Sequence, residues 1–225
     1  MTVQELALHI LDLFRNAVEA GARTVYIAVR EDSASDRMEI EVRDDGRGMT
    51  PNQARTACDP FFTTRTTRRV GMGLALLQAA AEQAGGELRI ESAPGEGTRV
   101  VATFRRGHID RAPLGDMAAT LEVAVAEPGV DVEYEHRRDG WVFRFSTEEL
   151  KRFLGVSARD DPGVLAWVNR HIAEGERALS SPRNALSPSP ENGLLSPVAA
   201  RAAAGNLSLA RGGEVVGGCK EVHLT

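Results

Sequence analysis

The chain has 225 residues, enough for one or two domains, and an ordinary globular composition with 42% hydrophobic and 26% charged residues. Its formal net charge of -5 gives no reason to expect nucleic acid or an anionic membrane as a partner. The two cysteines, Cys58 and Cys219, lie far apart and form neither a disulfide framework nor a metal-binding spacing. No apolar stretch is long enough to span a bilayer, and the N-terminus lacks the pattern of a signal peptide. We therefore expect a cytoplasmic protein.

The first 106 residues predict one α/β unit. In chain order, the expected elements are a helix at 3–20, strands at 24–29 and 38–42, a helix at 74–84 and strands at 87–92 and 98–104. Gly21 is expected to cap the first helix. Residues 49–70 show no sustained period and are unusually long for a connection, so we expect a loop-rich segment with a function or with mobility.

Two further segments follow. Residues 107–175 predict a small α+β extension, with a helix at 116–126 capped by Asp116, strands at 130–136 and 141–146, and helices at 147–154 and 162–174. Residues 176–225 contain no aromatic side chain and are rich in Ser, Gly and Pro. Such a composition buries too little apolar surface to offset the entropy of ordering, so we expect a disordered tail.

Two polar motifs in the first unit suggest a site. Asp12 and Asn16 are four residues apart on one face of the first helix, and oxygen ligands of this kind suit Mg²⁺ and a water molecule. Taken alone, an exposed polar helix face would give the same pattern. The stretch RDDGRGM at 43–49 follows a strand directly. Asp-Gly after a strand is typical of a hairpin turn, but a carboxylate at a strand end with glycines around it also suits a bound ligand.

A third motif, Gly71-Met72-Gly73, opens the helix at 74–84. Glycines before a helix expose N–H groups at the positive end of its dipole, where anions bind. The spacing fits neither a Walker A loop nor a dinucleotide-binding GxGxxG motif. The chain therefore predicts a phosphate site without a conventional P-loop.

In this order the motifs resemble the Bergerat-fold (GHKL) ATPases, the superfamily of gyrase B, mismatch-repair MutL proteins and histidine kinases. DLFRNAVEAGA resembles the N-box, DDGRGM the first glycine box, DPFFTT the lid, GMGLAL the second glycine box and GEGTRV the last box. The resemblance covers about residues 5–105 and is nearest to the histidine-kinase branch. It implies an α/β, Bergerat-type two-layer sandwich, in which a mixed sheet carries helices on one face. To this fold, 107–175 would add the extension and 176–225 the disordered tail.

The resemblance also implies roles for single residues, with ATP and Mg²⁺ as ligands. The residues assigned to ATP are Asn16, Asp44, Gly46, Gly48, Met49, Phe62, Gly71, Met72, Gly73, Leu74 and Thr98. Asp44 would accept a hydrogen bond from the adenine amino group, and Asn16 would bind the Mg²⁺ ion. Asp12, the candidate catalytic base, stands where hydrolytic members carry glutamate. The Asp12 side chain is one methylene shorter than glutamate and would hold the attacking water less well. ATP binding is therefore better supported than ATP hydrolysis.

Three functions fit these features. The first is a nucleotide-dependent regulatory switch for a protein partner, either a redox-enzyme subunit or a signalling protein, because 107–175 is similar to small ATP-binding proteins encoded beside iron-hydrogenase or NADH-oxidising subunits. The second is a protein kinase of the histidine-kinase or anti-sigma-factor type. The third is a nucleotide-binding scaffold without turnover. No segment resembles the phosphate-carrying histidine box of a sensor kinase, and we interpret His9 as a local polar contact. Residues 107–175 would either extend the core or dock the partner.

Overall fold

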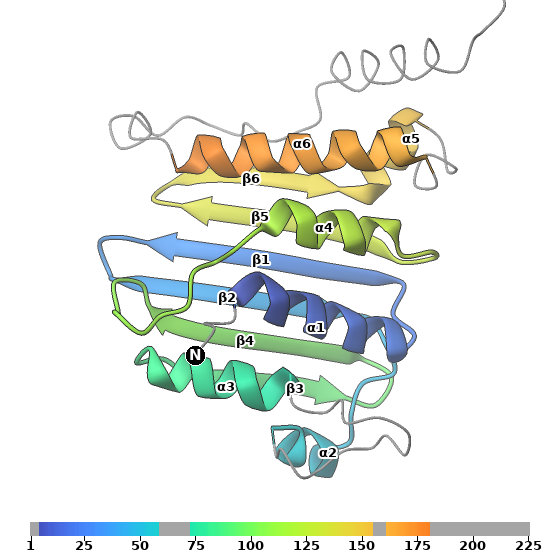
Figure 1. The fold of residues 1–225 in the computed structure, drawn as a ribbon. Helices are drawn as coiled ribbons and strands as arrows, with labels where there is room; N and C mark the ends of the chain where they lie inside the picture. The colour runs from blue at the N-terminus through green and yellow to red at the C-terminus, as the bar shows by residue number, and fades with distance from the viewer. Residues whose placement is uncertain (1–4, 59–72, 155–160, 181–225) are drawn as a thin grey trace, which may run out of the picture.

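The computed structural model describes residues 5–58, 73–154 and 161–180. Six strands form one mixed sheet in the order β3-β4-β2-β1-β5-β6 (Figure 1). The strands are β1 (Thr24–Asp32), β2 (Arg37–Asp44), β3 (Leu88–Ala93), β4 (Gly97–Arg105), β5 (Asp131–Arg138) and β6 (Trp141–Ser146). The helices are α1 (Leu6–Glu19), α2 (Pro51–Thr56), α3 (Gly73–Gln83), α4 (Met117–Ala126), α5 (Thr147–Leu154) and α6 (Pro162–Leu179). Within those three ranges, no helix combines the length and the apolar character needed to cross a membrane.

One face of the sheet is covered by helices α3, α1, α4 and α6, which lie side by side (Figure 1). Alternate residues of the central strands point into this layer: Val25, Ile27 and Val29 of β1 are fully buried. The predicted apolar stripe of α1, from Leu6 through Ile10, Leu13 and Ala17, is buried against them. Each fully buried aliphatic side chain contributes roughly 1.5–3 kcal/mol. The predicted α/β class, with a mixed sheet and helices on one face, is confirmed.

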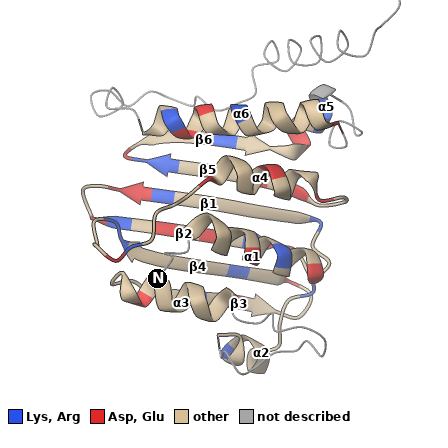
Figure 2. Cartoon of the chain, viewed as in Figure 1, with Lys and Arg blue, Asp and Glu red and all other residues tan. Residues whose placement is uncertain are grey.

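The opposite face of the sheet is open and charged. Glu41 of β2, only 5% exposed, accepts hydrogen bonds from Arg30 of β1 at 2.8 Å and Arg99 of β4 at 2.7 Å. Further along the sheet, Glu135 of β5 accepts one from Arg144 of β6 at 2.9 Å. Charges of both signs alternate across the strands (Figure 2). Opposite charges on neighbouring strands stabilise their pairing. Among the described helices, α1, α3, α4 and α6 all lie on the other face (Figure 1).

Residues after 106 continue the same sheet. Strand β5 pairs in parallel with β1 over Thr24–Glu31 and Asp131–Arg138, and β6 pairs antiparallel with β5. Helices α4 and α6 continue the helix layer, and Asp116 caps α4 by accepting a hydrogen bond from the Ala119 N–H at 2.9 Å. The extension is therefore part of the core, whereas its use as a docking surface stays a prediction.

The predicted boundary between the last helix and the tail needs correction. Helix α6 runs five residues past the expected end at 174, so residues 176–179, expected to belong to the disordered tail, are helical. Gly175 does not stop the helix; it lies against the Phe143 ring, where a side chain would collide. The segment 49–70, predicted to be loop-rich, contains one short helix, α2, which starts at a capping box formed by Thr50 and Gln53. The rest of that segment, with Phe62, and the expected tail beyond residue 180 lie outside the described residues.

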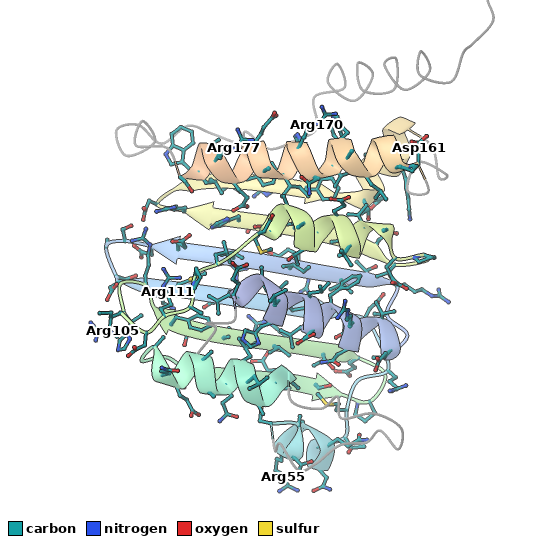
Figure 3. The ribbon with its side chains drawn as sticks, viewed as in Figure 1. Arg55, Arg105, Arg111, Asp161, Arg170 and Arg177 are labelled. Atoms are coloured by element: carbon teal, nitrogen blue, oxygen red, sulfur yellow. The ribbon has the colours of Figure 1, made fainter. Side chains whose placement is uncertain are left out.

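The two ends of the sheet differ. Strand β2 ends at Asp44, on the side where α2 carries Arg55. The other end carries Arg105 and Arg111 (Figure 3). There the Arg111 side chain donates to the Arg106 carbonyl at 2.6 Å. Those of the predicted nucleotide residues that the structure describes gather at the first end.

Candidate functional site

The two aspartates after β2 have different roles. Asp45 is exposed, and its Oδ1 accepts hydrogen bonds from the Arg23 N–H at 2.7 Å and the Thr24 N–H at 2.9 Å, which ties the end of β2 to the start of β1. Asp44 is half-buried, and its Oδ1 accepts a hydrogen bond from the Gly46 N–H at 2.9 Å. Burial raises the pKa of the Asp44 carboxyl, and the N–H groups of Gly46 and Thr98 oppose this shift. Asp44 is therefore the carboxylate available to a ligand.

The stretch at 43–49 is not a hairpin turn. Strand β2 pairs with β1 and β4, and the chain then leads into α2. The Gly46 position has no room for a side chain, since a Cβ would lie 2.8 Å from Ala20 Cβ and 2.9 Å from Asp44 Oδ1. Gly48 has φ +64°, and a Cβ there would collide with the Ala93 carbonyl. Both glycines let the backbone lie close to neighbouring segments, Gly46 to Ala20 and Gly48 to Ala93. Because Gly46 has no side chain, the Asp44 carboxylate stays uncovered.

Hydroxyl groups lie beside Asp44 on the neighbouring strands. Thr98 of β4 stands opposite Asp44 in the register, and Ser92 of β3 stands opposite Thr98. The Ser92 oxygen is 2.9 Å from Thr98 Oγ1, accepts from the Met49 N–H at 2.8 Å and donates to the Gly97 carbonyl at 2.8 Å. The sequence motifs did not include Ser92. The feature that could have indicated it is a small polar residue on the helix-facing side of a strand.

Helix α1 contributes a second group of polar side chains. Asp12 and Asn16 are one turn apart; 39% of the Asp12 side chain is exposed, and Asn16 is exposed. Gly73 begins α3 directly against Asp12, because a Cβ on Gly73 would lie 3.4 Å from Asp12 Cβ and 3.6 Å from Oδ2. Leu74, the next residue, packs on the core. The start of α3, a favourable place for an anion, therefore lies beside Asp12.

The backbone links the two groups. The Arg47 N–H donates to the Ala20 carbonyl at 3.0 Å, so the glycine stretch after Asp44 is bound to the turn that ends α1. Gly21, with φ +77°, follows as predicted for the cap of that helix. The structure thus brings the α1 residues, the end of β2 and the β3–β4 hairpin to one end of the sheet. Gly71 and Met72 lie outside the described residues.

His9 lies on α1, one turn before Asp12. It is 3% exposed, and its Nδ1 has no hydrogen-bond partner among the residues that the structure describes. Burial lowers the pKa of His9, and the nearby Asp12 carboxylate opposes this shift. His9 therefore lies on the buried side of α1 near Asp12, and its Nδ1 makes no hydrogen bond within the described part of the chain.

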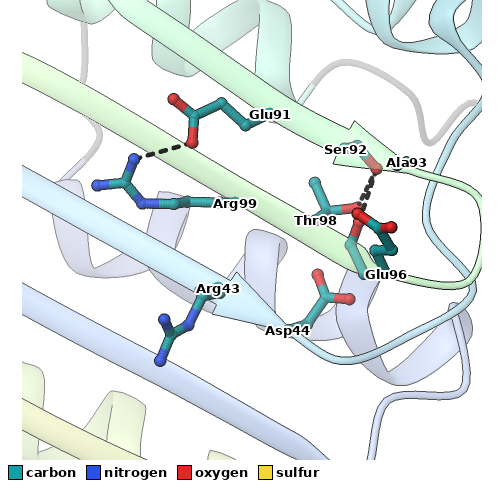
Figure 4. A pocket seen from close by; sticks show the side chains of 9 residues that line it. Arg43, Asp44, Glu91, Ser92, Ala93, Glu96, Thr98 and Arg99 are labelled. Carbon is teal, nitrogen blue, oxygen red and sulfur yellow. Dashed lines mark hydrogen bonds and ion pairs between the residues drawn. The ribbon is translucent and has the colours of Figure 1, made fainter.

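A cavity of about 260 Å³ opens where β2 ends beside the β3–β4 hairpin (Figure 4). Its lining combines side chains of both sheet faces. Asp44, Ser92 and Thr98 belong to the helix-covered face, and the register places Arg43 and Arg99 on the open face. The cavity is smaller than the roughly 300–1,000 Å³ pockets that enclose whole drug-sized ligands.

Comparison with known proteins agrees with this geometry. Residues 2–108 match the family described as "Histidine kinase-, DNA gyrase B-, and HSP90-like ATPase". This part of the chain is a histidine-kinase-like ATP-binding domain.

The similar curated proteins include sensor kinases. The chain is 41% identical over 90 residues to sensor histidine kinase ZraS of Klebsiella oxytoca, covering 39% of this chain and 19% of that protein. It is 33% identical over 119 residues to the non-motile and phage-resistance protein of Caulobacter vibrioides, covering 49% and 14%. The chain thus spans less than a fifth of these relatives. The structure of the N-terminal domain of a DNA repair protein has a TM-score of 0.48 at 14% identity, over 68% of this chain and 57% of that one.

Proposed function

We propose that this chain is a Mg·ATP-binding protein that acts as a nucleotide-dependent regulatory switch for a partner protein. The observation that carries the ATP site is the half-buried Asp44 carboxylate, left uncovered by Gly46 at the end of β2. A fixed carboxylate suits the amino group of adenine, because a hydrogen bond to a charged acceptor stabilises by about 1.5–3 kcal/mol. ATP, bound in this way, would direct its phosphates towards the start of α3.

The residues of α1 fit a magnesium ion. Mg²⁺ prefers oxygen ligands, keeps several waters and takes one or two protein groups beside the substrate phosphates. Asn16 offers an exposed amide oxygen one turn from Asp12, and Gly73 holds the start of α3 against Asp12. Asn16 would hold the ion, which screens phosphate charge when bound. Asp12 would orient or deprotonate a water molecule, which supports slow hydrolysis at most.

The proposal of a switch draws on the continuity of the sheet. Strand β1, which follows α1 and begins beside Asp45, pairs along its length with β5 of the extension. A nucleotide that fixes the ends of α1 and β2 would therefore act on the same sheet that carries β5, β6 and α6. The partner is a redox-enzyme subunit or a signalling protein, for which the extension supplies the surface. The setting is the cytoplasm.

The kinase alternative is favoured by one finding, the likeness to sensor histidine kinases over the ATP-binding part. One experiment separates it from the switch. The purified chain is immobilised and incubated with the soluble fraction of its source cells, with Mg·ATP, with ATP and chelator, or without nucleotide, and with Asp44→Asn as the matched control bait. The switch predicts a partner whose capture depends on Mg·ATP and is lost with the control. Capture that ignores nucleotide contradicts the switch, and transfer of labelled γ-phosphate to the captured protein establishes the kinase.

A further inference from the structure

Three hydrogen-bonding groups meet at the Ser92 hydroxyl, and their chemistry fixes the position of every proton. The Met49 N–H, at 2.8 Å, can only donate, and the Gly97 carbonyl, at 2.8 Å, can only accept. Ser92 has a single hydroxyl hydrogen, which the Gly97 carbonyl takes. The third neighbour, Thr98 Oγ1 at 2.9 Å, must therefore donate its hydrogen to Ser92. With the opposite orientation, the Gly97 carbonyl and Ser92 would face each other as two acceptors.

This orientation of the Thr98 hydroxyl determines what its oxygen offers to a ligand. Because its only hydrogen is directed at Ser92, its oxygen presents lone pairs alone to the cavity that it lines with Asp44. In its ionised form the Asp44 carboxylate is also an acceptor without a hydrogen, and its Oδ1 already receives the Gly46 N–H. Asp44 and Thr98 stand opposite each other in the register. Two neighbouring acceptors therefore face any ligand that enters at this end of the sheet.

We propose that Ser92 is a positioning residue that locks Thr98 as a hydrogen-bond acceptor, so that the site selects a purine with an amino group at position 6 over one with a carbonyl there. This inference rests on the proposed ATP site and deepens it. The two hydrogens of an exocyclic amino group satisfy both acceptors, directly or through a water molecule. A carbonyl in the same place meets lone pairs on both sides, and groups left unpaired in a desolvated site cost affinity.

The test compares ATP with inosine triphosphate, which has nearly the same shape but carries a carbonyl at position 6 and a hydrogen on N1. Affinities are measured by calorimetry in the full chain for wild type, Ser92→Ala, Thr98→Val and the double variant. Wild type should prefer ATP by at least about tenfold. In Ser92→Ala the Thr98 hydroxyl is free to turn and to donate to the carbonyl, so the preference should fall towards one. Thr98→Val should lower the preference to a similar extent, and the double variant should change it no further.

The comparison separates positioning from mere support of the fold. If Ser92 only held Met49 in place, Ser92→Ala would weaken both nucleotides equally and leave their ratio unchanged, which would overturn the inference. Ser92→Thr keeps the hydroxyl and should keep the preference, and Thr98→Val still tests the idea if Ser92→Ala fails to fold. Thr103→Val, on β4 but bonded to Glu87, is the matched control and should alter neither affinity. Failure of wild type to bind either nucleotide would instead refute the proposed ATP site.

Discussion

Replacing His136 with glutamine should remove a pH-dependent part of the stability of the fold. His136, in β5, is 3% exposed. Its Nδ1 lies 2.9 Å from a Glu176 oxygen of α6, and its Nε2 lies 3.3 Å from Glu31 of β1. Arg106 also donates to Glu31, at 2.8 Å. Burial lowers the pKa of His136, but the hydrogen bonds and charges of the two carboxylates outweigh it and raise the pKa from 6.5 to about 9.

The sign and the size follow from linkage. A histidine whose pKa is higher in the folded than in the unfolded chain contributes fully below pH 6.5, and the contribution is lost as the pH rises through about 9. Since a tenfold change in proton affinity is worth about 1.4 kcal/mol, the difference between the two pKa values corresponds to ~3 kcal/mol. The lower pKa of Glu31, about 2 in the folded chain, keeps that partner ionised across the same window.

The assay is denaturant unfolding at pH 6 and pH 9.5 for wild type, His136→Gln and the control His108→Gln. His108 has a more exposed side chain, 26% accessible, and its nearest carboxylate is 3.9 Å away. Between pH 6 and pH 9.5, the free energy of unfolding of wild type and of His108→Gln should fall by up to ~3 kcal/mol more than that of His136→Gln. An equal loss of stability in all three proteins would refute the assignment of a charged His136 between Glu31 and Glu176.

Three further substitutions probe the site. Gly48→Ala should lower the thermal midpoint more than Gly95→Ala, since both positions have positive φ but only a Cβ at Gly48 meets the Ala93 carbonyl; equal shifts would contradict the close packing. Asn16→Ala should weaken ATP binding chiefly in the presence of Mg²⁺, and equal losses with and without the ion, measured by calorimetry, would argue against a metal role. Asp12→Asn should remove most of any slow hydrolysis, a loss of about 10²–10⁴-fold in single turnover if Asp12 is the base; an unchanged rate would mean that it is not.

Local patterns in the sequence predicted most elements. The stripe of α1 that contains Leu6 and Ile10 has helical spacing, and the alternation in β1 and β2 has the period of a half-buried strand, so each could be assigned without knowledge of its neighbours. The Asp116 cap depends on contacts three residues away and was equally accessible. Asp44 followed from the resemblance, and the structure adds the reason why Asp44, rather than Asp45, is available to a ligand.

What the sequence did not predict depends on distant contacts. The parallel pairing of β1 with β5 joins segments about a hundred residues apart, and no periodic pattern encodes a partner strand. Gly175 lies against the Phe143 ring of β6, and this contact with another segment accounts for a glycine inside α6. His9 is a polar residue on a buried side of α1, and the role of Ser92 depends on Met49 and Thr98 from two other segments. Each of these features exists only after the chain has folded.

The ATP site itself is tested most directly by calorimetry of Mg·ATP with wild type and Asp44→Asn. The substitution replaces a charged acceptor, and the account predicts an affinity lower by at least about tenfold, or ~1.4 kcal/mol. Asp45→Asn is the matched control, because an amide oxygen can still accept from the Arg23 and Thr24 N–H groups, and it should leave the affinity nearly unchanged. An Asp44→Asn protein that melts like wild type and binds Mg·ATP equally tightly would contradict the assignment of Asp44 as the adenine anchor.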